Sequence, residues 1–96
     1  MRQRYIVTYD VCSPRRLRLV FKTMKGFGQH LQLSVFRCDL SPMALALMKG
    51  KLLQIIHSEE DQVLIVDVGP TEGRGNEAFE SLGRPYVDQS SEPKVI

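Results

Sequence analysis

The stretch that most limits the possible folds of this chain is residues 4–18, RYIVTYDVCSPRRLR. It begins with β-branched and aromatic residues, which favour a strand. The run ends at Asp10, and the Ser13-Pro14 pair that follows is typical of a helix start. Serine caps the first turn of a helix, and proline needs no hydrogen-bond acceptor there. The order predicts a strand that ends at Asp10 and then a turn into a helix.

Asp10 is the first candidate functional residue. A residue at the end of a strand is held by the sheet but still faces solvent, which suits a metal ligand or a general base. The alternative is that its carboxylate only accepts hydrogen bonds from the amides of the turn. This stretch alone leaves both possibilities open.

The helix after the turn is predicted from Pro14 to Lys25. Its apolar residues recur with the i, i+3, i+4, i+7 spacing of one helix face. They are Leu17, Val20, Phe21 and Met24. Basic residues occupy most of the other positions, and Gly26 supplies a C-terminal stop.

The remaining elements are a region of alternating polarity, a helix and a strand. Over residues 30–40 the period changes to two, which fits one long bent strand or two short strands that meet near Ser34. A second Ser-Pro start at Ser41-Pro42 precedes a helix predicted over 43–57, and an apolar strand follows over 62–68. With two strands in the middle the order is βαββαβ. We therefore predict a ferredoxin-like α+β fold, with two helices on one face of a sheet.

The C-terminal part is less regular. A glycine-rich linker at 69–75 leads to 77–82, which fits a short strand or a turn, and then to a polar segment with two prolines. We predict one domain over 1–83 and an extended arm over 84–96. The arm ends in apolar Val95-Ile96, which suggests that it docks on the sheet of a second copy. We therefore expect a homodimer.

Charge is distributed unevenly along the chain. Residues 1–60 carry ten Lys or Arg and four Asp or Glu, a net charge of +6, whereas residues 61–96 carry three and seven, a net charge of −4. Much of the basic part lies on the first predicted helix, which fits a polyanion partner or a solvated helix face. No apolar run approaches the length of a membrane span and no leader is recognisable, so we expect a cytoplasmic protein with no membrane partner.

Several motifs together resemble the small CRISPR-associated protein 2 family, the compact nucleases of the spacer-acquisition machinery. They are Tyr9-Asp10-Val11, the arginine-rich helix start, Gly28 with the QLSVF run at 32–36, and Glu60-Asp61 before the last core strand. The resemblance runs from Arg4 to Val68, and Leu82-Gly83 fit the short fifth strand of the family. It implies a ferredoxin-like homodimer and an antiviral role with the family's integrase. It also implies an endonuclease, a phosphodiesterase dependent on Mg²⁺ or another divalent cation, that acts on RNA or DNA.

The resemblance also implies roles for individual residues. Asp10 corresponds to the metal-binding, catalytic carboxylate, and Tyr9 flanks it in the catalytic site. Arg16, Arg18 and Phe36 match residues that bind nucleic acid. Ser13 departs from the pattern, because many relatives carry a second acidic residue there.

Two other functions compete with the nuclease. One is a non-catalytic dimeric scaffold for the integrase, with Asp10 in a structural role. The other is an unrelated ferredoxin-like regulator or single-strand binder, whose bases would stack on Tyr5, Tyr9 and Phe36. Since one chain offers one convincing carboxylate, the nuclease hypothesis requires a dimer that brings two Asp10 side chains together.

Overall fold

The structure, a computed structural model, describes residues 2–73 and 78–86. Its elements follow the order strand, helix, two strands, helix, strand. They are β1 (Gln3–Asp10), α1 (Pro14–Lys25), β2 (Gln29–Gln32), β3 (Val35–Leu40), α2 (Pro42–Ile55) and β4 (Gln62–Pro70). The predicted βαββαβ order is confirmed, and the region over 30–40 forms two strands.

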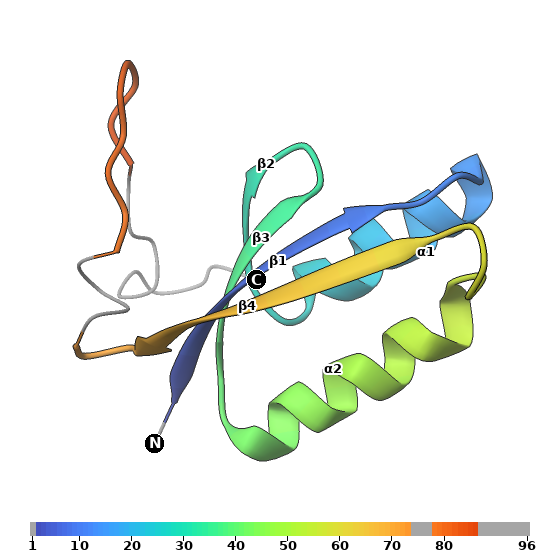
Figure 1. The fold of residues 1–96 in the computed structure, drawn as a ribbon, viewed down its shortest axis with the longest axis horizontal. Coiled ribbons are helices and arrows are strands. Elements are labelled where there is room, and N and C mark those ends of the chain that lie inside the picture. The colour runs from blue at the N-terminus through green and yellow to red at the C-terminus, as the bar shows by residue number, and fades with distance from the viewer. Residues whose placement is uncertain (1, 74–77, 87–96) are drawn as a thin grey trace.

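The four strands form one antiparallel sheet in the order β2-β3-β1-β4. The first strand is therefore central, with Phe36 of β3 opposite Val7 on one side and Ile65 of β4 opposite it on the other. The two helices lie together on one side of the sheet (Figure 1), and one buried cluster joins them to it. The ferredoxin-like fold is confirmed.

Both Ser-Pro pairs start helices as predicted. The Ser13 hydroxyl accepts a hydrogen bond from the Arg16 amide at 3.3 Å, and the Ser41 hydroxyl accepts one from the Ala44 amide at 3.2 Å. These contacts satisfy amides that have no partner inside the helix. The predicted end of the second helix was two residues too late, since α2 stops at Ile55.

Gly28 lets the chain leave α1 and enter the sheet. A Cβ atom at this position would lie 2.3 Å from the Arg37 carbonyl oxygen and 2.6 Å from the Cys38 sulfur. Any side chain would therefore push the β2 edge away from β3.

The core lies between the helices and one face of the sheet. Its fully buried side chains are Val7, Val20, Met24, Phe36, Cys38 and Met48. The opposite face of the sheet is open and partly apolar. Leu64 and Val66 of β4 are about half exposed there, at 51% and 49%, opposite Thr8 and Ile6 of β1. Strand alternation places these four residues on the side away from the helices.

The described residues after β4 form no strand. Phe79 and Tyr86, in the segment 78–86, stack on each other with ring centroids 4.7 Å apart (Figure 1, orange). Leu82-Gly83, where the resemblance placed a fifth strand, forms a bend, with Gly83 at φ +85°. The predicted fifth strand is therefore wrong for the chain as described here. Most of the predicted arm, including Val95-Ile96, lies outside the described residues.

The segment 78–86 contacts the sheet on the face away from the helices. The Arg4 side chain is buried, with its Nε 2.7 Å from Asp39 and its guanidinium 6.0 Å from the centre of the Phe79 ring. Arg37 of β3 donates to the Tyr86 hydroxyl. Neither helix, within the part of the chain that the structure describes, has the length and apolar run needed to cross a membrane.

Candidate functional site

Asp10 lies where the sequence predicted it, exposed at the end of β1. It is the last residue of the strand, opposite Gln62 of β4. Within residues 2–73 and 78–86 its carboxylate has no hydrogen-bond or ion-pair partner, so it is available to an external cation. In the described chain, Asp10 does not accept hydrogen bonds from the amides of the turn, which was the alternative role. A different carboxylate accepts the hydrogen bond from the Cys12 amide.

That carboxylate is Asp61, just before β4. Its oxygens accept hydrogen bonds from the Cys12 amide at 2.9 Å and the His57 amide at 2.8 Å. They also accept two from Arg16 of α1, from Nε at 2.7 Å and from an Nη at 3.2 Å. We call this group, Cys12, Arg16, His57 and Asp61, the Asp61 clamp. It joins the turn after Asp10, the first helix and the loop before β4.

The Asp61 clamp keeps the Asp61 carboxylate ionised. Its side chain has no exposed surface, which alone would favour the neutral acid. The Arg16 hydrogen bonds, followed by those from the His57 and Cys12 amides, nevertheless hold the pKa of Asp61 far below its ordinary value. Glu60 adds a more exposed contact to Arg16 at 3.0 Å. The Arg16 guanidinium is therefore already engaged by two carboxylates.

Tyr9 points to the other side of the strand from Asp10. The residue is 6% exposed, and its ring stacks on that of Phe36 with centroids 6.2 Å apart. Burial raises the pKa of the Tyr9 hydroxyl above its ordinary value of 10, so this group keeps its proton at neutral pH. It can donate a hydrogen bond there, but it is not a ready base.

Phe36 is completely buried. It packs against Tyr9, Phe21 and His30, with ring centroids 4.9 to 6.2 Å apart. This leaves the ring no surface with which to touch nucleic acid in the described chain. In the structure Phe36 packs beneath the Tyr9, Phe21 and His30 rings as part of the core.

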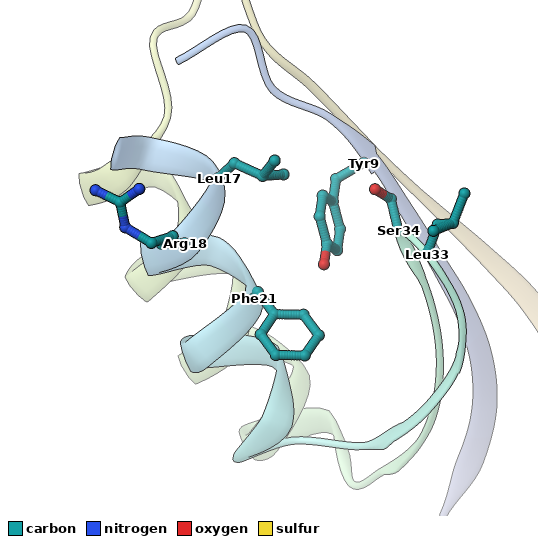
Figure 2. Close-up of a pocket in the computed structure, with 6 residues that line it drawn as sticks. All are labelled: Tyr9, Leu17, Arg18, Phe21, Leu33 and Ser34. Atoms are coloured by element: carbon teal, nitrogen blue, oxygen red, sulfur yellow. The ribbon is translucent and has the colours of Figure 1, made fainter. Parts of the chain in front are cut away.

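An open pocket of about 500 Å³ lies between α1 and the β2–β3 turn. Its walls are Tyr9, Leu17, Arg18, Phe21, Leu33 and Ser34 (Figure 2). In the figure Leu17 and Phe21 reach from α1 toward the Tyr9 ring, while the Arg18 guanidinium points outward. The structure thus brings Tyr9 and Arg18 to one pocket and turns Arg16 to the Asp61 clamp.

Metal ligands are sparse in one chain. Across residues 2–73 and 78–86 there is no group of three His, Cys, Asp or Glu side chains placed to hold a metal ion. The free Asp10 carboxylate fits Mg²⁺ only as part of a larger set, because protein sites for this ion use one or two carboxylates with waters and substrate phosphate. Among the described residues, one chain therefore offers such an ion a single free carboxylate at the end of β1.

Sequence reasoning missed Asp61 and the pocket residues Phe21 and Leu33. In the sequence, Asp61 stands out only within the Glu60-Asp61 family motif, and Phe21 only as a member of the apolar face of the first helix. An acidic residue directly before an apolar strand is a weak sign that its carboxylate accepts hydrogen bonds from nearby amides. Nothing in the local sequence identifies Arg16 and Cys12 as the partners of Asp61.

Comparison with known proteins gives a consistent result. The family model for CRISPR associated protein Cas2 matches residues 1–73. CRISPR-associated endoribonuclease Cas2 1 of Rhodospirillum rubrum is 44% identical over 92 residues, which are 96% of this chain and 89% of that protein. CRISPR-associated endoribonuclease Cas2 of Geobacter sulfurreducens is 49% identical over 72 residues, 75% of this chain and 76% of that protein.

A solved structure agrees with the sequence matches. Streptococcus pyogenes Cas2, crystallised and solved at pH 6.5, superimposes with a TM-score of 0.73 and 34% sequence identity, and the match covers 83% of this chain and 99% of that chain. The family model spans all the strands and helices described above. The chain belongs to the CRISPR-associated protein Cas2 family.

Proposed function

We propose that this chain is a CRISPR-associated endoribonuclease, acting on RNA or DNA, that works in spacer acquisition beside the family's integrase. The observation that carries the proposal is the exposed Asp10 carboxylate, free of partners in the described residues, in a family whose curated members are named endoribonucleases. Asp10 would hold Mg²⁺ or another divalent cation. When bound, such an ion offsets phosphate charge and lowers the pKa of a bound water.

The proposal includes a homodimer. Asp10 continues the alternation of Ile6 and Thr8 along β1, so it belongs to the open face of the sheet, which also carries Leu64 and Val66. A second copy on this face would bury the exposed apolar residues and bring two Asp10 side chains near one axis. A small domain gains much from such burial.

The other residues of the chain would position Asp10 and substrate. The Asp61 clamp holds the Cys12 amide, two residues beyond Asp10, and so limits the movement of the turn. Arg18 is exposed and carries no ion pair in the described residues, so its guanidinium can hold phosphate without reading base identity. Arg16 would add to the positive potential, but its hydrogen bonds are directed to Asp61 and Glu60.

Asp10→Asn tests the catalytic proposal. The substitution keeps the shape and removes the charge, so Mg²⁺-dependent cleavage of labelled RNA or DNA should fall by orders of magnitude. The melting temperature should stay within a few degrees of the parent, because the carboxylate has no partner to lose in the described chain. Cleavage equal to that of the parent would exclude Asp10 as the metal ligand.

A non-catalytic scaffold is the second candidate. The lack of a three-residue metal cluster in the described part of one chain favours it. In that case the purified dimer would bind nucleic acid and integrase but would cleave neither RNA nor DNA at any Mg²⁺ concentration. Light scattering at micromolar concentration tests the dimer that both candidates share, and a stable monomer would contradict both.

A further inference from the structure

We propose that the pocket between α1 and the β2–β3 turn binds one unpaired nucleobase, while cations on α1 hold the neighbouring phosphates. The inference rests on the nucleic-acid-binding part of the proposed function and does not depend on hydrolysis. It gives the protein a second contact with a nucleic-acid strand, in addition to the candidate metal site at Asp10. The pocket lies on the helix side of β1 with Tyr9, whereas Asp10 alternates to the opposite face.

The lining of the pocket suits a flat, apolar ring. Tyr9 and Phe21 supply aromatic surface, and Leu17 and Leu33 supply aliphatic surface around it (Figure 2). The volume of about 500 Å³ falls within the usual range of small-ligand pockets. Proteins that bind single strands commonly stack bases on such aromatic side chains.

Two hydroxyl groups give the pocket polar contacts. The structure records no protein hydrogen-bond partner for the side-chain hydroxyl of Tyr9 or Ser34 in the part of the chain that it describes, although the Ser34 carbonyl accepts the Tyr9 amide at 3.1 Å. Both are therefore able to bond to the edge of a base. A few polar groups in an apolar lining are typical of sites that orient a small ligand.

The charges around the pocket favour a nucleotide over a neutral apolar ligand. Arg18 and Lys25 are seven residues apart on α1, which places them on one side of the helix. Lys25 lies 5.5 Å from the centre of the Phe21 ring, and Arg18 forms part of the pocket wall. Among the described residues, no acidic side chain lines the pocket. Phosphates on both sides of a bound base would meet these cations, whereas paired and stacked bases of a duplex could not enter.

The test measures binding in the Asp10→Asn variant without divalent metal, so that cleavage does not interfere. The ligands are a labelled eight-nucleotide single strand, its duplex, and the same strand with abasic residues. We expect the intact single strand to bind roughly tenfold more tightly than the abasic strand, the range that base stacking on an aromatic residue gives. Equal binding of intact and abasic strands would overturn the inference.

A pair of matched variants tests whether the base-dependent binding takes place at this pocket. Leu33 is 91% exposed at the pocket rim and Leu53 is 71% exposed on α2, so Leu33→Asp and Leu53→Asp change the same charge at surface leucines. We expect Leu33→Asp to lose roughly tenfold in single-strand affinity, since it removes a wall and repels phosphate, while Leu53→Asp stays near the parent. Equal losses in the two variants would overturn the inference.

The outcomes also separate this inference from the proposed function. Base-dependent binding in a protein that never cleaves would support the pocket and contradict the proposed hydrolysis. If neither single strand nor duplex binds the parent, both the pocket and the nucleic-acid partner are overturned.

Discussion

Arg16 and Arg18 lie two residues apart on the same helix but have different surroundings. Two residues span about 200° around a helix, so the side chains leave α1 on nearly opposite sides. Arg16 reaches the buried Asp61 carboxylate, whereas Arg18 lines an open pocket and extends into solvent. Both arginines match the same motif, yet Arg16 pairs with Asp61 and Glu60, whereas Arg18 has no ion-pair partner among the described residues.

The two arginines give α1 one side that is tied into the fold and another side that faces an open pocket. On the Arg16 side, the guanidinium charge is balanced by the Asp61 and Glu60 carboxylates. Part-buried hydrogen bonds to Asp61 tie the turn after Asp10 to the loop before β4. On the Arg18 side, positive charge stands beside aromatic rings, and the described residues that line the pocket include no acid. A double Arg16 and Arg18 variant would therefore mix a loss of stability with a loss of binding, and single variants are needed.

The largest expected effect is at the Asp61 clamp. Asp61→Asn keeps the shape but leaves Arg16 facing a neutral amide in a buried place, so we expect the melting temperature to fall by on the order of 10 °C. Thermal unfolding followed by circular dichroism measures it. Because the Cys12 amide loses a charged acceptor, cleavage should also fall. A melting temperature within 2 °C or so of the parent would show that the clamp contributes little.

The pH dependence of stability provides a second test of the clamp. The pKa of Asp61 is lower in the folded chain than in the unfolded chain, where an aspartate titrates near 4. Its contribution is therefore complete above that value and is lost as the pH falls through it and below. The difference in melting temperature between the parent and Asp61→Asn should shrink from pH 6 to pH 3. A difference that stays constant would mean that Asp61 does not titrate with folding.

The contrast also explains what the sequence could and could not predict. The strand ending at Asp10 and both Ser-Pro helix starts depend on local patterns, and the structure confirms them. Arg16 and Arg18 look alike locally, and only the position of a loop 45 residues further along the chain distinguishes them. Phe36 likewise sits in a motif that suggested contact with nucleic acid, but the packing of three other rings covers it.

A smaller effect is expected on the Arg18 side, and it concerns binding and not stability. Arg18→Ala should weaken binding of RNA and DNA of any sequence by roughly three- to tenfold at low salt and reduce the salt slope by about one. Its melting temperature should match that of the parent, because the side chain is exposed. Lys49→Ala on α2 removes the same charge away from the pocket and serves as the control. Equal losses in both variants would indicate a diffuse electrostatic effect.

The smallest effect separates the two acids that contact Arg16. Glu60 and Asp61 are neighbours, but the Glu60 side chain is 55% exposed and that of Asp61 has no exposed surface. An exposed ion pair is screened by water and salt, so Glu60→Gln should lower the melting temperature by about 3 °C or less. Adding salt should remove that difference while leaving most of the Asp61→Asn effect. If Glu60→Gln lowered the melting temperature as much as Asp61→Asn, both acids would stabilise Arg16 equally. The burial of Asp61 would then not explain the contribution of the clamp to stability.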